Sequence, residues 1–188
     1  MEKKLFIKNM VCNRCIKVIE NDIRRLGIEL LHIELGSIIY QETDSMQFKS
    51  ITKVIEENGF EVLLAPEKQL VEEIKKELIE LLKKLPLQLD STLSRFLEQK
   101  LNKEYSKISK LFSSQEHITI EKYFIKLKME KVKELIQLQE NNFTEISELL
   151  NYSNSNHLSR QFKSETGMSL TDYKKLQKND RNPLDQIM

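Results

Sequence analysis

The C-terminal half of this 188-residue chain contains an internal repeat whose two copies lie 50 residues apart. Residues 108–123 align without a gap on residues 158–173, and apolar or aromatic residues occupy the same positions in both copies. Each copy follows a short amphipathic segment and a polar turn, which is typical of a helix-turn-helix unit. This half is therefore expected to fold as two such units. The matched positions are Ile108, Phe112, Ile118, Ile120 and Tyr123 in the first copy and Leu158, Phe162, Met168, Leu170 and Tyr173 in the second.

The segment between the two units predicts one long helix. Apolar residues recur at helical spacing from Thr119 to about Leu138, with Tyr123, Leu127, Val132, Leu135 and Ile136 facing inward. About twenty residues of α-helix span about 30 Å, and successive major grooves on one face of a duplex lie about 34 Å apart. We therefore expect this helix to hold the two units so that one chain can address two groove segments.

Another amphipathic helix is expected between Pro66 and Pro86. Leucine and isoleucine residues line one side of residues 67–85, and Pro86 ends the helix because proline offers no backbone N–H. Three uses are open to this helix, namely packing on the following domain, connecting the two halves, or forming a homodimer contact. The interval 66–88 is predicted as an amphipathic connecting helix.

The first 65 residues show a different pattern, in which short strands alternate with two helices. The order strand-helix-strand-strand-helix-strand is that of a ferredoxin-like βαββαβ domain of the α+β class. Gly27 is expected to end the first helix in a left-handed conformation, and Gly36 lies in the turn of a hairpin. Strands are expected at residues 3–9, 28–34, 37–42 and 60–64, and helices at residues 13–26 and 48–58.

The only two cysteines of the chain, Cys12 and Cys15, stand where the first strand gives way to the first helix. Two thiolates at this spacing can bind one soft metal ion or form a disulfide with each other. The positive end of the helix and Arg14 both favour the thiolate form. Two thiolates with an open coordination position suit Cu(I), whereas a structural zinc site needs two further ligands. The histidines are weaker candidates, because His32 falls in an expected strand and His117 and His157 lie in the helical half.

Charge and composition limit the classes of function. Residues 91–178 carry 15 Lys/Arg and 11 Asp/Glu, whereas residues 1–90 carry 14 and 16, so the basic surplus lies in the helical half. Such a surplus is compatible with nucleic-acid binding. No segment resembles a signal peptide or a membrane span, and two cysteines do not make a disulfide framework, which favours the cytoplasm. No residue pattern indicates an enzyme.

The stretch from about Leu89 to Leu176 resembles the DNA-binding domain of the AraC/XylS family of bacterial transcription regulators. The strongest match is the run His157-Leu-Ser-Arg-Gln-Phe-Lys-Ser-Glu-Thr-Gly-Met-Ser-Leu-Thr-Asp-Tyr173, and Tyr105-Ser-Lys-Ile-Ser-Lys-Leu-Phe112 is the corresponding run of the first unit. The chain departs from the family pattern at Gln115-Glu116-His117, where Glu-Thr-Gly is common, and at Asn151, where glycine is usual.

This resemblance implies that the second helix of each unit enters the major groove of double-stranded DNA. Arginine can bind guanine and asparagine can bind adenine through two hydrogen bonds each, whereas lysines mostly contact phosphates. The implied DNA-binding residues are Tyr105, Lys107 and Lys110 in the first unit and Ser155, Asn156, Arg160 and Lys163 in the second.

The first 64 residues resemble the heavy-metal-associated domain of copper chaperones and metal-pumping ATPases. Met10-Val-Cys-Asn-Arg-Cys15 fits the Met-x-Cys-x-x-Cys motif of that family, and Asn58-Gly-Phe-Glu-Val62 fits its late glycine-aromatic segment. Asn9 and Val11 depart from the glycine and threonine that are common there. The resemblance implies that Cys12 and Cys15 bind Cu(I) or another soft metal ion.

Together these observations predict a cytoplasmic two-domain transcription regulator. Residues 1–65 form the sensor, 66–88 the connecting helix, 89–178 the DNA-binding domain with its two units joined by a long helix, and 179–188 a flexible tail. A homodimer through the N-terminal domain or the 67–85 helix is compatible with this organisation. Two alternatives stay open, a metal carrier whose helical half docks a partner protein and a thiol-based redox-sensing regulator.

Overall fold

The computed structural model of the protein describes residues 1–89 and 91–176, and the predicted tail 179–188 lies outside this range. The chain divides into two compact units, Met1–Lys76 and Glu77–Met188. The division falls inside helix α3 (Pro66–Lys83), so residues of this helix belong to both units. No helix in the described part of the chain has both the length and the apolar composition needed to cross a membrane.

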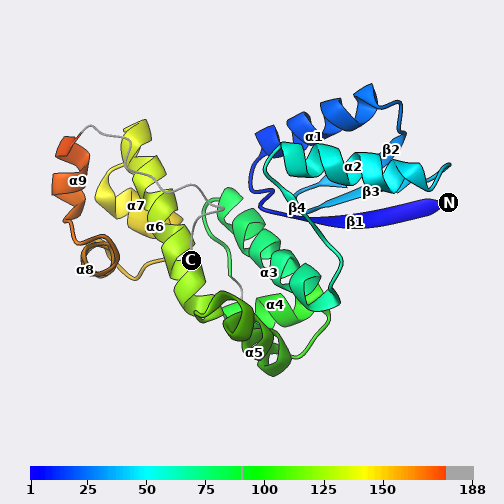
Figure 1. The fold of residues 1–188 in the computed structure, drawn as a ribbon. Helices are drawn as coiled ribbons and strands as arrows, with labels where there is room; N and C mark the ends of the chain where they lie inside the picture. Colours follow the sequence, from blue (N-terminus) through cyan, green and yellow to red (C-terminus); the bar gives the residue numbers. More distant parts are fainter. Residues whose placement is uncertain (90, 177–188) are drawn as a thin grey trace. The chain divides into compact units, whose positions relative to one another are not determined.

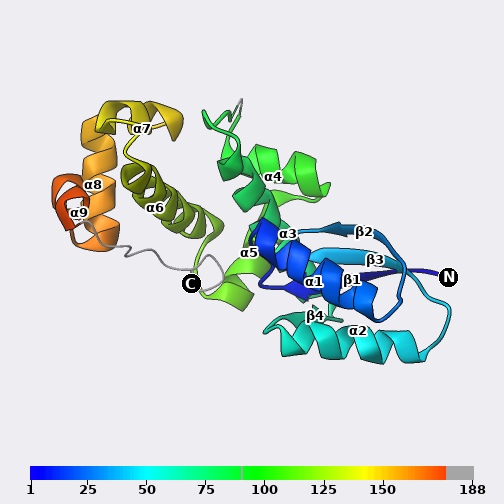
Figure 2. The ribbon, with the colours of Figure 1, turned by 90° about the horizontal axis from the view of Figure 1, so that it is seen from above.

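The first unit contains a four-stranded antiparallel sheet with strand order β2-β3-β1-β4. Two helices follow the first and third strands, and both cover the same face of the sheet (Figures 1 and 2). The elements are β1 (Glu2–Lys8), α1 (Asn13–Arg25), β2 (Leu30–Glu34), β3 (Ser37–Gln41), α2 (Met46–Glu57) and β4 (Glu61–Leu63).

The core of this unit follows from two periodicities. Leu5 and Ile7 are buried on one side of β1, because alternate residues of a strand point to the same face. Helices α1 and α2 contribute isoleucines one turn apart, Ile19 with Ile23 and Ile51 with Ile55, all of which are inaccessible to solvent. Leu26, which follows α1 in the helical pattern, is instead 43% exposed because the helix has ended at Arg25.

The hairpin turn at Gly36 lies beside the end of β1. Gly36 has φ of 78°, a left-handed conformation that favours glycine. Its carbonyl accepts a hydrogen bond from the N–H of Ile7 at 2.8 Å. The turn is thereby fixed two residues before Asn9, where the chain leaves β1 and enters the loop that carries Cys12.

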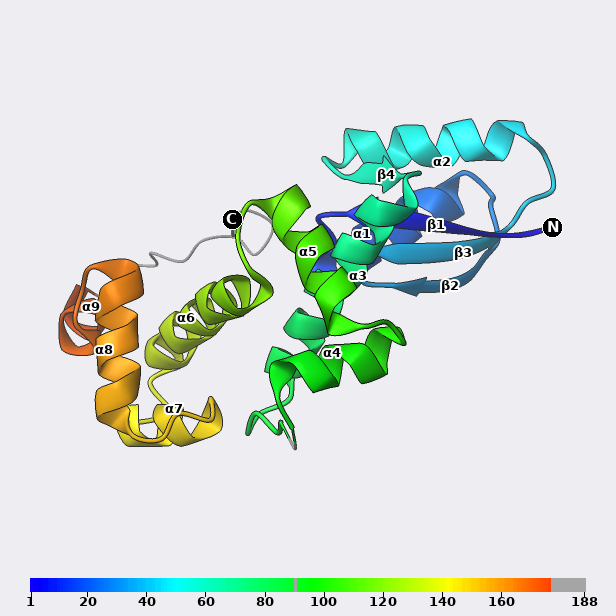
Figure 3. The same cartoon turned by 90° about the horizontal axis from the view of Figure 1, so that it is seen from below.

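The first part of α3 crosses the face of the sheet opposite α1 and α2 (Figure 3). Val71 and Ile74 are buried on this helix. Lys76 forms an ion pair with Glu34 of β2 at 2.7 Å, and the hydroxyl of Ser37 on β3 donates to the same carboxylate at 3.0 Å. Burial raises the pKa of Glu34, but Lys76 and Ser37 outweigh that effect and lower it overall.

All secondary-structure elements in the described residues of the second compact unit are helices, and they include both predicted helix-turn-helix units. The first consists of α4 and α5 and the second of α7 and α8, and α6 joins them. Their bounds are α4 (Leu93–Leu101), α5 (Tyr105–Glu116), α6 (Ile120–Leu138), α7 (Phe143–Leu149), α8 (Ser155–Thr166) and α9 (Leu170–Leu176).

The internal repeat is reproduced in the packing of aromatic side chains. Phe112 of α5 meets Tyr123 of α6 edge-on, with ring centroids 5.4 Å apart. Phe162 of α8 meets Tyr173 of α9 in the same way at 5.6 Å. All four residues are buried, so these matched positions of the repeat lie in the core of the helical unit.

The linking helix α6 has the predicted bounds and the predicted inward side. Tyr123, Leu127, Val132, Leu135 and Ile136 are all buried. Its 19 residues correspond to about 28 Å of helix. The sequence pattern did not reveal a buried ion pair on this helix, in which Lys133 donates to Glu130 at 2.8 Å.

Helices α5 and α8, the second helices of the two helix-turn-helix units, are named the recognition helices. Both end in the same backbone conformation, although the residues at their ends differ. At the end of α8, Gly167 has φ of 78° and its N–H donates to the carbonyl of Lys163 at 2.9 Å. At the end of α5, His117 has φ of 58° and donates to Ser113 at 3.0 Å. A left-handed conformation is unfavourable for a residue with a Cβ atom. His117 therefore carries backbone strain that Gly167 avoids.

We expect His117→Gly to raise the free energy of unfolding by about 0.5–1 kcal/mol, because relief of the strain exceeds the greater freedom of glycine in the unfolded chain. Gly167→His should lower it by a similar amount. Ser114→Gly is the control, since Ser114 lies within α5 and glycine there destabilises by about 0.5–1 kcal/mol. Urea unfolding followed by circular dichroism measures all three variants. A loss of stability in His117→Gly would contradict the assignment of strain.

Candidate functional site

The two cysteines lie together at the start of α1. Cys12 is the N-cap residue and Cys15 lies in the first turn, where its N–H donates to the carbonyl of Cys12 at 3.0 Å. Their sulfur atoms are 3.4 Å apart, and both thiols are free and partly exposed. This separation is far longer than a disulfide bond, which is about 2.05 Å. The loop therefore presents two reduced sulfur donors side by side.

The local backbone stabilises a thiolate at Cys12. Burial is the largest single influence and raises the pKa of this thiol, but hydrogen bonds with the backbone and side chains of Cys15 and Arg14 together outweigh it, so the pKa is lowered overall. Lowering this pKa increases the thiolate population, and the thiolate is the form that binds metals and reacts with oxidants.

The donor set fits a soft ion that accepts two sulfur ligands. The two sulfur atoms are 3.4 Å apart and both are partly exposed, so both could be ligands of one ion. Among the described residues no group of three or more His, Cys, Asp or Glu side chains is arranged to hold a metal ion. His32 lies on β2 with Glu34 as its neighbour at 3.9 Å, and Met10 is buried. Closed four-ligand zinc coordination is therefore not available from the described residues.

The Cys12 thiol should react with iodoacetamide at lower pH in the native protein than in the urea-unfolded protein, because the thiolate is the reactive species. Peptide mass mapping of the reduced wild-type chain over a pH series gives the midpoint for Cys12. Arg14→Gln should move the native midpoint upward, whereas the control Arg25→Gln, in the last turn of α1, should leave it in place. A native midpoint at or above the unfolded one would disprove thiolate stabilisation.

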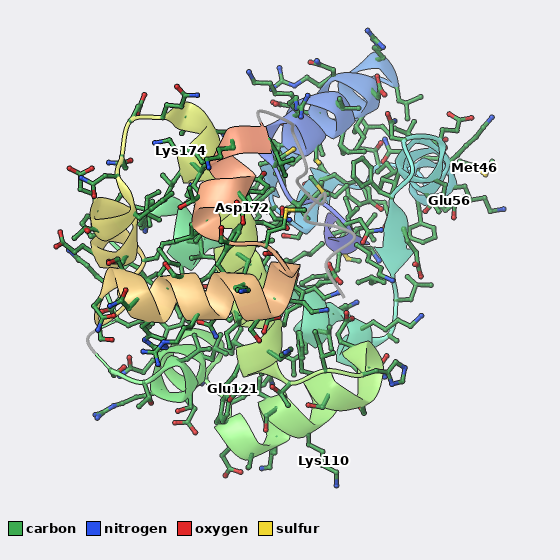
Figure 4. The ribbon with its side chains drawn as sticks, turned by 90° about the vertical axis from the view of Figure 1, so that its left-hand side faces the viewer. Met46, Glu56, Lys110, Glu121, Asp172 and Lys174 are labelled. Atoms are coloured by element: carbon green, nitrogen blue, oxygen red, sulfur yellow. The ribbon has the colours of Figure 1, made fainter. Side chains whose placement is uncertain are left out.

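The predicted DNA-binding residues of the first unit lie on α5. Lys107 and Lys110 are exposed, and Lys110 projects from α5 away from the other helices of this unit (Figure 4). Lys107 forms an exposed ion pair with Glu104 at 3.1 Å. Such a pair contributes little to stability, so the ammonium group remains able to exchange its partner for a phosphate.

Tyr105, which was predicted to contact DNA, has a hydrogen-bond partner within the protein that the sequence did not indicate. Its hydroxyl donates to the carboxylate of Glu121 in the first turn of α6. Burial raises the pKa of the Tyr105 hydroxyl, and Glu121 raises it further. The ring is only partly exposed, so Tyr105 holds α5 against α6 whether or not its edge also meets DNA.

In the second unit, the predicted residues lie on the first three turns of α8. Asn154 caps the helix by accepting the N–H of His157 at 2.8 Å, and Ser155 is its first helical residue. Asn156, Arg160 and Lys163 are all exposed and follow each other at four- and three-residue steps, which places them on one side. The structure thus brings these three side chains together, as the sequence predicted.

The first turn of α6 also contacts the second recognition helix. Lys122 donates to Glu165 near the end of α8 at 3.1 Å. The neighbouring residue Glu121 accepts from Tyr105 of α5. One turn of the linking helix is therefore bonded to both recognition helices, and neither contact was visible in the sequence pattern.

A third unforeseen contact lies at the turn of the second unit. The ammonium nitrogen of Lys128 on α6 is 3.8 Å from the ring centroid of Tyr152, which lies in the turn between α7 and α8. Tyr152 is buried, and its hydroxyl donates to Gln161 of α8 at 2.8 Å. A lysine inside the helical pattern of α6 gave no signal in the sequence, since charged residues are ordinarily assigned to the solvated side.

Two comparisons with known proteins find similarity that includes the helical half. Residues 97–176 match the family described as "Helix-turn-helix domain". A solved structure, the C-terminal domain of AraT, a response regulator from Geobacillus stearothermophilus, is 24% identical and aligns with a TM-score of 0.50 over 63% of this chain and 93% of that one. A search of curated proteins gives no significant match. Residues 97–176 are thus similar in sequence to a helix-turn-helix family, and the likeness to the AraT domain concerns the fold.

Proposed function

We propose that the protein is a sequence-specific transcription regulator whose helices α5 and α8 enter the major groove of double-stranded DNA. The observation that carries the proposal is the exposed row Asn156, Arg160 and Lys163 on a capped recognition helix of an AraC-type domain. Asparagine and arginine are the side chains that distinguish adenine and guanine in that groove. Lys107 and Lys110 supply positive charge on α5.

Arg160→Ala and Asn156→Ala should each weaken binding to a duplex enriched by the wild-type protein from a random pool. The expected loss is roughly 10–100-fold, since each base contact is worth about 1–3 kcal/mol. Lys163→Ala should weaken enriched and scrambled duplexes alike and reduce the salt slope by about one. The control is Arg25→Ala, which replaces an exposed arginine on α1 of the N-terminal compact unit. Fluorescence anisotropy measures the affinities, and retention of affinity in Arg160→Ala would contradict the assignment.

The N-terminal unit is proposed to be the sensor, a ferredoxin-like domain that binds Cu(I) or a similar soft ion through Cys12 and Cys15. Its strand order and its two helices on one face support the resemblance to heavy-metal-associated domains. The two sulfur atoms 3.4 Å apart and the lowered pKa of Cys12 support soft-metal binding. Cys12 and Cys15 would hold the ion, and its positive charge would offset the negative charge of their thiolates.

Coupling between the sensor and DNA binding is proposed to run through α3. The loop of the cysteines follows β1, whose Ile7 is bonded to Gly36 in the β2–β3 turn. Glu34, at the start of that turn, holds Lys76 of α3. Because α3 continues into the helical unit, a change in this contact biases a segment that both units share. Linkage then requires only that metal binding favours one position of α3.

Submicromolar Cu(I) should change the DNA affinity of the wild-type protein by about five-fold or more. Cys12→Ser/Cys15→Ser should abolish the change, and Lys76→Met should reduce it while leaving Cu(I) binding intact. Lys68→Met is the matched control, because its pair with Glu61 is exposed and 3.9 Å long on the same helix. DNA anisotropy with and without Cu(I) gives the ratio, and competition with a Cu(I) chelator gives metal affinity.

The sulfur separation also favours a second candidate, a thiol redox sensor in which hydrogen peroxide oxidises the pair to a disulfide and is itself reduced to water. A DNA affinity that responds to peroxide but not to Cu(I) would select this candidate. If neither reagent acts, or the double serine variant behaves as wild type with both, the sensor proposals are wrong. A protein that binds Cu(I) but ignores duplex DNA would be a metal carrier instead.

A further inference from the structure

We propose that Lys128 is a positioning residue for the second recognition helix, acting through Tyr152. This inference rests on the proposed DNA-binding function and assigns a role to a residue of α6 that projects toward the turn. Lys128, Tyr152, His157 and Gln161 are named the Tyr152 cluster below. Lys128 and His157 contact the Tyr152 ring, and Gln161 accepts a hydrogen bond from its hydroxyl.

Tyr152 connects three helices. The backbone N–H of Tyr152 donates to the carbonyl of Ser147 on α7 at 2.8 Å. On α8, its hydroxyl donates to Gln161, and the ring of His157 meets it edge-on with centroids 5.3 Å apart. From α6, Lys128 places its ammonium nitrogen 3.8 Å from the ring centroid. Tyr152 is only 8% exposed, so this arrangement sets where α8 begins relative to α6.

The ammonium of Lys128 is held by the ring rather than by a carboxylate. No ion pair of Lys128 is found within the described residues, and burial lowers its pKa to about 8. At pH 7, burial of the charged Lys128 side chain therefore lowers the free energy of unfolding. A cation over an aromatic ring is favourable when partly desolvated, and the contact fixes the ring in a direction that a neutral side chain would not.

The position of the cluster explains why a directed contact matters there. His157 lies one residue beyond Asn156 and three before Arg160, so the turn of α8 that touches Tyr152 also carries two predicted base contacts. Base discrimination depends on placing such groups accurately. A shift of the first turn of α8 would weaken specific binding without removing any group that touches DNA.

Lys128→Met keeps the length of the side chain and removes its charge. We expect the affinity for the enriched duplex to fall about ten-fold, while the affinity for a scrambled duplex and the salt slope stay unchanged. The urea midpoint at pH 7 should match or exceed that of wild type, because the cost of burying the charge is gone. Lys128→Arg should rescue specific binding, since guanidinium also stacks on aromatic rings. Lys126→Met, on the same helix, is the matched control.

The pH dependence has a defined sign. Specific affinity of the wild-type protein should fall from pH 7 to pH 9 as Lys128 loses its proton, and it should be flat in Lys128→Met and Lys128→Arg. The other titratable groups at the cluster are Tyr152 itself and, from α8, His157 and Glu165, which is paired with Lys122. The series is therefore repeated in His157→Gln, where the fall should persist.

A measurement without DNA separates this inference from the proposed function. In the free protein, NMR signals of the Tyr152 ring and of the α8 amides should shift with a midpoint near pH 8 in wild type and Lys126→Met, and not in Lys128→Met. If no duplex is enriched from the pool, the proposed function fails while this titration still tests the contact. Equal loss on both duplexes with a salt slope smaller by about one would make Lys128 a phosphate contact and overturn the inference. An unchanged ratio of specific to nonspecific affinity would overturn it as well.

Discussion

Burial of one continuous side of α6 is the constraint on which the helical unit depends. This helix contacts α5 of the first helix-turn-helix unit, α8 of the second, and α9, which follows α8. Because the helix is stiff along its length, a single buried side orients both recognition helices relative to one axis. Apolar burial supplies most of the stability, at about 1.5–3 kcal/mol for each large side chain. The polar contacts of Glu121 and Lys122 are worth about 1 kcal/mol or less each, so they set direction rather than stability.

The sequence predicted the elements of this unit well because their signals are local. The 50-residue repeat aligned His117 with Gly167, and both residues adopt the same left-handed conformation, so the backbone is repeated even where the residue type is not. Contacts between side chains of different elements could not be predicted. Tyr105 was assigned to DNA from its position, yet its hydroxyl bonds to Glu121. Lys128 was passed over because periodicity places a lysine in solvent, although its ammonium lies over a buried ring.

The thiol site was predictable for the same reason, since Cys12 and Cys15 lie within one helical turn and their spacing needs no tertiary information. The number of donors was not predictable, because a third ligand could have come from any element that folds beside the loop. The described residues offer none. Two sulfur donors favour an ion of low coordination number, and a thiol held partly exposed at a helix N-terminus can gain or lose such an ion without unfolding the domain. These properties support the proposal that Cys12 and Cys15 bind a soft ion reversibly.

The strength of the proposed coupling through α3 is limited by the kind of contact that holds this helix. The Lys76–Glu34 pair has side-chain exposures of 23% and 35%, and partly exposed pairs contribute about 1 kcal/mol or less. Breaking this pair alone can therefore change DNA affinity by only several-fold. A larger response requires that the buried residues Val71 and Ile74 of α3 also change their packing, since only apolar burial offers several kcal/mol. The size of a metal response, compared between wild type and a protein without the ion pair, thus separates release of one contact from displacement of the whole first half of α3.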